Sequence, residues 1–263
     1  MKKNNKKPRV YYAKAVYGKA EIKAVNKVLE NPLKIGPGEC VKTFERKIAK
    51  LFGKNHGVMV NSGSSANMLA VDVLDLPKGS EVITPVLTFA TTVAPLVQKS
   101  LVPVFVDIEE GTYVVNLDQV EKAITKKTKA LMIPSLIGNV PDLDRLRSLA
   151  KKHKLYLIED SADTLGATFA GRPTGEYTDI STTSFYASHV ITAAGGGGIV
   201  RRAGDARGVE AAGEDPAGGP AGRAGARGGS GGGLARHVRR RARGGLLRCR
   251  RHSEVPERLR SRP

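Results

Sequence analysis

The stretch LYLIEDSADTLGA, residues 155–167, combines a short apolar run with three acidic side chains. The run ends in Glu159 and Asp160, and Asp163 follows three positions later. Apolar runs of this length, bounded by polar residues, are typical of strands buried in a sheet. Ligands of parallel sheets bind beyond the carboxyl ends of the strands, so this stretch predicts both a buried strand and one wall of a site.

Similar runs recur along the first 200 residues. Six more are short and mostly β-branched, as buried strands are: HGVMVN, SEVITP, VPVFVDI, KALMIP, DISTTSF and GGIV. Helical patterns precede or separate the early runs: KAEIKAVNKVLE, CVKTFERKIAKLF, SSANMLAVDVL, FATTVAPLVQ, LDQVEKAI and DLDRLRSLAKKH. This alternation predicts an α/β fold with a mostly parallel seven-stranded sheet and helices on both faces.

The composition changes abruptly after Val200. Residues 1–200 contain 22 lysines and 5 arginines, whereas residues 201–263 contain 16 arginines and no Lys, Ile, Phe, Tyr, Asn, Gln, Thr or Met. The tail has too little apolar bulk to pack a core. The missing residue types have AT-rich codons and the abundant ones GC-rich codons, which favours a frameshifted translation. An Arg/Gly-rich tail that binds RNA is the alternative. Such tails usually carry aromatic residues and this one has none, so we expect no nucleic-acid partner.

The remaining bulk properties exclude several classes of protein. The chain has 263 residues, a formal net charge of +18 and two cysteines, which form neither a disulfide framework nor a four-ligand zinc spacing. We therefore expect no metal site. The basic start, MKKNNKKPRV, has no apolar segment behind it, and no run is long enough to span a membrane. The expectation is a cytoplasmic protein without a membrane partner.

Two further strand ends carry residues of interest. In VNSGSSANMLA, Gly63, Ser64 and Ser65 lie between a strand and a helix, where backbone N–H groups bind anions. Simple N-capping by serine is the alternative. In TPVLTFATTV, Phe89 follows a strand and could lie flat on a ring, although a core phenylalanine is the interpretation that this residue alone favours.

The last strand end lies in DISTTSFYASHVITAAGGGGIV, residues 179–200. Ser184 would add a hydroxyl to an anion site, and position 189 would point at a cofactor's reactive carbon. A lysine there would form the Schiff base of a pyridoxal phosphate enzyme, but the residue is His189. In such an enzyme Asp160 would hold the pyridinium nitrogen protonated, which makes the ring an electron sink. The alternative for Asp160 is a cap on the next turn.

The order and spacing of these stretches resemble the DegT/DnrJ/StrS family, nucleotide-sugar aminotransferases of the fold-type I pyridoxal phosphate class. The resemblance extends from about Tyr17 to Val200 and includes GPGECVKTFERKIAKLFG, VNSGSSAN, VPVFVDIEEGTY, IEDSAD and SFYASH. It implies a fold-type I PLP-dependent transferase-like fold that binds pyridoxal 5'-phosphate (PLP) or pyridoxamine 5'-phosphate (PMP).

The resemblance also implies roles for single residues. By it, the phosphate is held by Ser64, Ser65 and Ser184, next to Gly63. Phe89 stacks on the pyridine ring and Asp160 pairs with the ring nitrogen.

Asp163 also counts among the cofactor-binding residues, although it stands where aminotransferases of the family usually have a glutamine near the ring oxygen. Gly195 stands where many members have a glutamate.

His189 occupies the position of the Schiff-base lysine. This replacement resembles a branch of nucleotide-sugar 3-dehydratases that act on 4-keto-6-deoxyhexoses. The resemblance implies that His189 is a catalytic base, removing a proton from the cofactor methylene while the hydroxyl on carbon 3 leaves. Two alternatives stay open: an aminotransferase-like protein, and a non-catalytic relative or sequence error.

The predicted organisation has three parts: a basic arm (1–16), an incomplete PLP-binding large domain (17–200), and a Gly/Ala/Arg-rich disordered or frameshifted tail (201–263). The family continues into a small C-terminal domain that is missing here, so we expect the chain as written to be inactive. The resemblance implies a nucleotide-diphosphate sugar substrate, a homodimeric full-length parent, and products for surface polysaccharide, such as lipopolysaccharide, or secondary metabolites. A reductase partner stays open.

Overall fold

The computed structural model describes residues 14–31, 33, 38–191, 193 and 195–202. The predictions for the tail beyond residue 202 and for most of the basic arm lie outside these residues. In the described part of the chain, no helix is long and apolar enough to cross a bilayer.

The helices match the six predicted helical patterns. They are α1 (Lys19–Leu29), α2 (Glu39–Leu51), α3 (Gly63–Val73), α4 (Ala90–Gln98), α5 (Leu117–Ala123) and α6 (Leu143–His153). Short 3-10 helices, η2 (Leu136–Gly138) and η3 (Thr174–Tyr177), were not predicted. Their three or four residues are too short to leave a period in the sequence.

The seven predicted strands are also present. They are β1 (His56–Val60), β2 (Glu81–Pro85), β3 (Val102–Val106), β4 (Thr128–Pro134), β5 (Tyr156–Asp160), β8 (Ile180–Ser184) and β9 (Gly197–Arg201). A small hairpin, β6 (Thr168–Phe169) and β7 (Arg172–Pro173), forms a separate two-stranded sheet that was not predicted.

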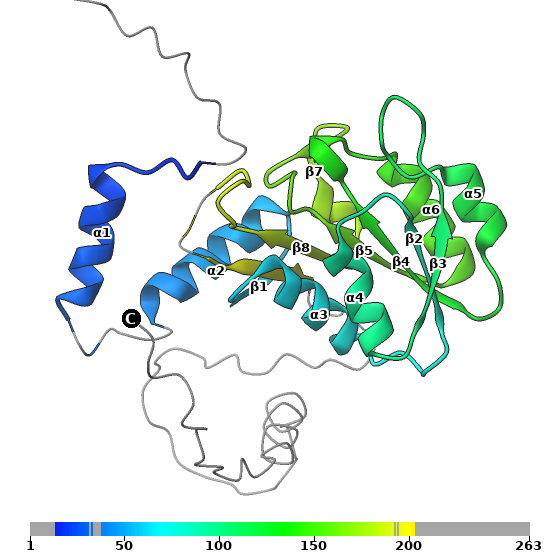
Figure 1. The fold of residues 1–263 in the computed structure, drawn as a ribbon, viewed down its shortest axis with the longest axis horizontal. Coiled ribbons are helices and arrows are strands. Elements are labelled where there is room, and N and C mark those ends of the chain that lie inside the picture. Colours follow the sequence, from blue (N-terminus) through cyan, green and yellow to red (C-terminus); the bar gives the residue numbers. More distant parts are fainter. Residues whose placement is uncertain (1–13, 32, 34–37, 192, 194, 203–263) are drawn as a thin grey trace, which may run out of the picture. The chain divides into compact units, whose positions relative to one another are not determined.

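The seven strands form one sheet in the order β1-β9-β8-β5-β4-β2-β3 (Figure 1). Strands β3, β2, β4, β5 and β8 pair in parallel, whereas β9 runs antiparallel to both β8 and β1. The prediction of a mostly parallel seven-stranded sheet is therefore confirmed. The reversed direction of β9 was not predicted, because a short apolar run carries no information about strand direction.

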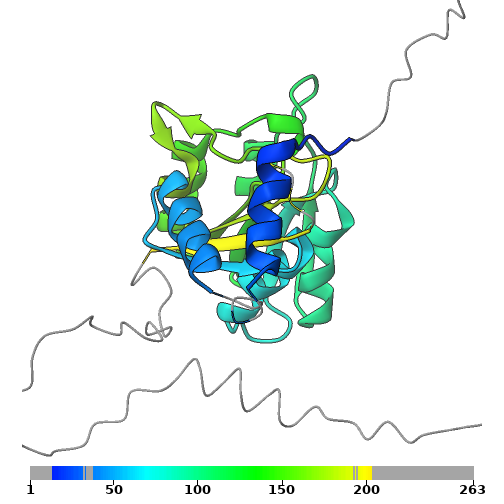
Figure 2. The same ribbon diagram turned by 90° about the vertical axis from the view of Figure 1, so that its left-hand side faces the viewer.

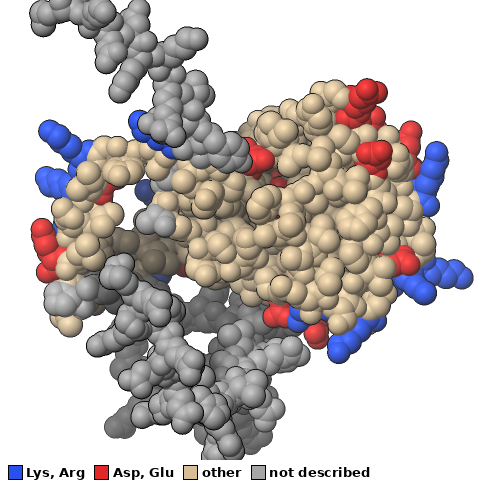
Figure 3. Space-filling model, viewed as in Figure 1, with Lys and Arg blue, Asp and Glu red and all other residues tan. Residues whose placement is uncertain are grey.

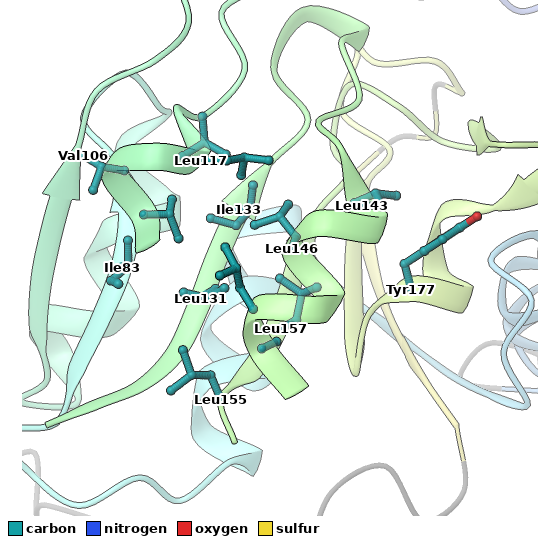
Figure 4. Packing of buried hydrophobic residues seen from close by; sticks show 14 residues of the cluster. Ile83, Val106, Leu117, Leu131, Ile133, Leu143, Leu146, Leu155, Leu157 and Tyr177 are labelled. Atoms are coloured by element: carbon teal, nitrogen blue, oxygen red, sulfur yellow. The ribbon is translucent and has the colours of Figure 1, made fainter. Parts of the chain in front are cut away.

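Helices cover both faces of this sheet, as predicted. One core packs α5 and α6 against the sheet (Figure 4). A second core packs α3 and α4 against the opposite face. Successive strand residues alternate between the two cores: Val82 and Ile158 contribute to the α3/α4 core, and Ile83 and Leu157 to the α5/α6 core. A third cluster joins α2 to β9 at one side of the sheet (Figure 2).

This alternation decides which side chains can meet near α3. On β5, Ile158 belongs to the α3/α4 core, so Asp160 points to the same face. On β8, Ile180 belongs to that core too, so Thr182 and Ser184 also point toward α3. Two strand ends and one helix therefore converge on one face.

Charged side chains of both signs are mixed on one face of the described part of the chain. On the face seen in Figure 3, Lys and Arg stand around the rim, interspersed with Asp and Glu. This face therefore shows no gathered basic patch of the kind that binds nucleic acids.

Candidate active site

Four strand ends lie at one edge of the sheet. Strands β2, β5 and β8 are parallel, and β1 has the same direction because it is antiparallel to β9. The carboxyl end of β2 leads into α4, and that of β1 leads into α3. Strand β5 ends at Asp160 and strand β8 at Ser184. The structure thus brings the predicted site residues to a single edge.

The start of α3 has the form of an anion site. Its N-cap is Ser62, whose Oγ accepts a hydrogen bond from the Ser65 backbone N–H at 3.1 Å and donates one to Ser65 Oγ at 3.0 Å. Serine N-capping is therefore real, but the cap is Ser62 rather than Ser64 or Ser65. Ser64 is exposed in the first turn. N–H groups of a first turn have no intrahelical acceptor and can bind an anion.

Ser184 lies directly against this helix start. A Cβ placed on Gly63 would stand 2.7 Å from Ser184 Cβ and 3.1 Å from Ser184 Oγ. Ser184 is 5% exposed and forms the end of β8. Only a residue without a side chain at position 63 lets the serine hydroxyl and the helix start share one space.

Asp160 is buried, and hydrogen bonds converge on one of its oxygens. Asn67 Nδ2 donates to Oδ2 at 2.8 Å and Thr92 Oγ1 donates to it at 2.9 Å. Oδ1 accepts from the Ala162 N–H at 3.3 Å, which is the turn-capping contact expected as an alternative. Burial raises the pKa of Asp160, and the bonds from Asn67 and Thr92 counteract that rise.

The neighbouring Glu159 points to the other face of the sheet. Ser181 Oγ donates to it at 2.8 Å and Ser161 Oγ at 3.2 Å, and its side chain is buried. Burial raises the pKa of Glu159. The hydroxyl groups that satisfy Glu159 tie β5 to β8, so its role is structural.

Phe89 is not a core residue. It is the N-cap residue of α4 and is 72% exposed, so the core interpretation is wrong. The residue stands beyond the end of β2, at the start of α4. An exposed aromatic ring at this position is available to stack on a planar ligand.

His189 lies beside Asp163. Its Nε2 is 3.7 Å from Asp163 Oδ1, and Asp163 Oδ2 accepts a hydrogen bond from the Ile137 N–H at 3.0 Å. The His189 Nδ1 is buried and has no hydrogen-bond partner in the described part of the chain. Ile137 has φ 57°, a left-handed conformation that is uncommon for a β-branched residue.

Gly195 departs from the glutamate of many family members. Its φ of 147° lies where L side chains rarely occur. The backbone here therefore needs glycine at this position.

These features fit a PLP-type cofactor. Ser184 and the start of α3 suit a phosphate, and exposed Phe89 suits a planar ring. Asp160 Oδ1 accepts only a long hydrogen bond, from the Ala162 N–H among the described residues, so it is available to a ring N–H. The unpartnered Nδ1 of His189 leaves a buried proton acceptor or donor without a protein partner, as expected at a ligand site.

Sequence reasoning missed four residues that build this site: Ser62, Asn67, Thr92 and Thr182. Thr182 Oγ1 donates to Asn67 Oδ1 at 2.6 Å. Two of the four had a usable signal. Asn67 lies one helical turn after Gly63, and Thr182 lies two residues before Ser184 on the same strand face.

Comparisons with known proteins agree with this geometry. The model of the DegT/DnrJ/EryC1/StrS aminotransferase family matches residues 16–207. The dTDP-4-dehydro-2,6-dideoxy-D-glucose 3-dehydratase of Saccharopolyspora spinosa is 43% identical over 176 residues, which are 64% of this chain and 38% of the relative.

Two solved structures have the same fold. The E. coli GDP-4-keto-6-deoxy-D-mannose-3-dehydratase with bound hydrated PLP superposes with a TM-score of 0.68 at 35% identity, over 72% of this chain and 50% of that one. A putative sugar aminotransferase from Streptococcus pneumoniae in its PLP form gives 0.70 at 30% identity, over 74% and 53%. The chain thus spans from about two fifths to about half of the length of these relatives.

Proposed function

Since the chain belongs to the DegT/DnrJ/EryC1/StrS aminotransferase family, we propose that it binds PLP or PMP at this sheet edge and serves the 3-dehydration of a nucleotide-4-keto-6-deoxyhexose. The observation that carries the proposal is His189, which stands at the end of the sheet where the family resemblance places a lysine. Two of the relatives named above are 3-dehydratases, which supports it.

In its PMP form the cofactor would supply a primary amine for the sugar ketone, and its ring would take up electrons. The chain would hold it at three points. The first-turn N–H groups of α3 and the Ser184 hydroxyl bind the phosphate, since an anion is stabilised at a helix N-terminus. Phe89 covers one ring face. Asp160, as a carboxylate, holds the proton on the ring nitrogen.

His189 would move the proton. An imidazole can accept a proton near neutral pH and return it to a leaving hydroxyl, as the elimination of water requires. Asp163, 3.7 Å from Nε2, would stabilise the charged imidazole and fix its orientation. Asp163 is itself held by the Ile137 N–H. The imidazole has no primary amine, so the cofactor would stay non-covalently bound at position 189.

An aminotransferase-like activity on a nucleotide sugar is the second candidate. The structural likeness to the putative sugar aminotransferase of Streptococcus pneumoniae favours it. His189 opposes it, because transfer of an amino group in this class uses a lysine to bind the cofactor covalently and to move the proton.

We also propose that the full-length protein is a cytoplasmic homodimer. Large apolar residues beside the site are exposed and would suit a covering partner: Val86 (60%), Leu87 (42%), Phe89 (72%), Tyr186 (63%) and Val190 (60%). A reductase partner stays an open prediction.

The test compares substrates and products. A protein translated in the restored frame after codon 200 would be incubated with PMP and a panel of nucleotide-4-keto-6-deoxyhexoses, and the sugar product analysed by mass spectrometry. Loss of the carbon-3 oxygen without added nitrogen supports 3-dehydration. A product that gains an amino group and keeps that oxygen supports the second candidate. No turnover of any member, with PLP binding absent, contradicts both.

A further inference from the structure

Asn67 is the closest polar neighbour of the Asp160 carboxylate on α3. It is 3% exposed, and its Nδ2 donates to Asp160 Oδ2 at 2.8 Å and to the Thr91 carbonyl at 3.4 Å. It lies one turn after Gly63, so the helix that opens at the anion site also carries the contact to Asp160.

Thr182 fixes which way the Asn67 amide faces. Its hydroxyl is buried and donates to Asn67 Oδ1 at 2.6 Å. If the amide were reversed, Oδ1 would stand against the Asp160 carboxylate, and two acceptors would meet without a proton between them. The bond from Thr182 therefore keeps the Asn67 NH₂ directed at Asp160.

Thr92 supplies the second donor in the same way. Its hydroxyl donates to Asp160 Oδ2 and accepts from the Thr88 hydroxyl at 2.9 Å. Both neutral donors thus converge on Oδ2. Within the described part of the chain, Asp160 Oδ1 accepts one hydrogen bond, from the Ala162 N–H at 3.3 Å.

Among the described elements packed around Asp160, helix α4 and strand β8 contain no titratable side chain. Asp72 on α3 pairs with Lys99, Lys129 on β4 donates to the Lys126 carbonyl, and His189 lies beside Asp163. Asp163 faces Asp160, and its negative charge acts with burial to raise the pKa of Asp160. The hydrogen bonds from neutral donors, Asn67 and Thr92 above all, are therefore what lowers the pKa of Asp160 against burial and Asp163.

We propose that Asn67, held by Thr182, is a positioning residue that keeps Asp160 ionised and leaves Oδ1 directed at the cofactor's ring nitrogen. The proposal rests on the proposed function for the identity of the cofactor. It goes beyond that function because it assigns a role to two residues that need not touch cofactor or substrate.

The consequence is a shift along the pH axis. PLP held through its ring N–H needs Asp160 as a carboxylate, so binding weakens as the pH falls through the pKa of Asp160. Without the Asn67 donor the carboxylate loses a stabilising bond, and its pKa rises further. We expect Asn67→Leu to move the weakening of PLP binding upward by about one pH unit, which is about tenfold in affinity below the midpoint.

The experiment uses the full chain and two readouts. Equilibrium dialysis with PLP from pH 5 to 8.5 gives the pH at which PLP binding is half lost. The titration of PLP itself is the same for every variant, so it does not affect the difference between them. Carbon-13 NMR of the aspartate carboxyls, in the cofactor-free protein, follows Asp160 directly once Asp160→Asn has identified its signal. The variants are Asn67→Leu and Thr182→Val, with Asn67→Ala as the substitute if the leucine variant does not fold.

Thr183→Val is the matched control. Thr183 is the buried neighbour of Thr182 on the opposite face of β8, where its hydroxyl bonds to the Ser161 carbonyl at 3.2 Å. We expect both readouts to shift upward in Asn67→Leu, less in Thr182→Val, and not in Thr183→Val.

Unchanged Asp160 titration in the Asn67 variants, or an equal shift in Thr183→Val, would overturn the proposal. Absence of PLP binding in the parent chain would instead count against the proposed function, while the NMR titration would still decide the role of Asn67.

Discussion

Two adjacent glycines should respond very differently to alanine. A Cβ on Gly197 would lie 2.4 Å from the Ser62 carbonyl oxygen and 2.6 Å from the Gly63 nitrogen, and both atoms are backbone. Real Cβ contacts essentially never fall below 3.0 Å, so the turn that opens α3 would have to move by about 0.6 Å or more. A Cβ on Gly198 would meet its nearest atom, Thr183 Cγ2, at an ordinary 3.6 Å.

The energetic consequence follows from these contacts. Overpacking against rigid backbone costs about 1–3 kcal/mol, so Gly197→Ala should lower the free energy of unfolding by about that amount. Displacing the first-turn N–H groups of α3 removes charge-assisted bonds to a phosphate, and PLP should bind about tenfold more weakly. Gly198→Ala should leave affinity unchanged and alter stability by about 1 kcal/mol or less, through the reduced freedom of the unfolded chain.

Urea unfolding and PLP dialysis of the two variants beside the parent chain measure both quantities. If Gly197→Ala unfolds and binds PLP as the parent does, the close packing of β9 beneath the α3 turn is refuted. Equal losses of stability and PLP affinity in Gly198→Ala would show that any alanine in β9 is harmful. The contact between Gly197 and the turn that opens α3 would then have no specific role.

Three further predictions concern buried charge and the histidine. Burial raises the pKa of Asp160, so the folded chain keeps the carboxyl proton of Asp160 to a higher pH than the unfolded chain does. The free energy of unfolding should therefore fall as the pH rises from about 4 through the raised pKa. Urea midpoints measured against pH should show a weaker fall in Asp160→Asn. Lys54→Met should lower the free energy of unfolding by about 1–3 kcal/mol, because the carbonyls of Thr178 and Asp179 lose a buried donor; a urea midpoint equal to that of the parent would contradict this. Borohydride treatment with PLP should leave the peptide containing His189 unmodified but label it in His189→Lys, as peptide mass spectrometry would show; an adduct on the parent peptide would contradict a non-covalent site.

The sheet and its helices could be predicted because the apolar runs of the strands and the apolar stripes of the helices are both clear in this sequence. Runs such as KALMIP and SEVITP are short, apolar and β-branched, and the helical stripes between them repeat every three to four residues. Besides the 3-10 helices η2 and η3, two features escaped prediction. The β6–β7 hairpin has two-residue strands, and the direction of β9 depends on a pairing with β1 that begins some 140 residues earlier along the chain.

The site was predictable only in outline. The residues after each strand end were found, because parallel strands gather their carboxyl ends at one edge. The orientation of single side chains was not. The chemistry of Phe89 by itself favoured a core position, and only the family resemblance assigned it to the cofactor ring; the structure places it exposed at the N-cap of α4. Asn67 was passed over because its partner lies 93 residues away.

The roles of the site residues and the division at residues 17–200 stay predictions. The coding DNA tests the proposed frameshift: a second frame after codon 200 should restore lysine, isoleucine and aromatic residues. If no frame does so, the tail is a genuine part of the protein.

The role of His189 is decided by the rate at which a nucleotide-4-keto-6-deoxyhexose loses its 3-hydroxyl in the restored-frame protein with PMP. The comparison is between the parent, His189→Asn, and His153→Asn, which changes a histidine at the exposed end of α6. We expect the parent and His153→Asn to form the 3-deoxy product at similar rates, and His189→Asn to bind PMP normally but form almost none. Equal dehydration rates in the parent and His189→Asn would show that another group moves the proton and that His189 is not the catalytic base.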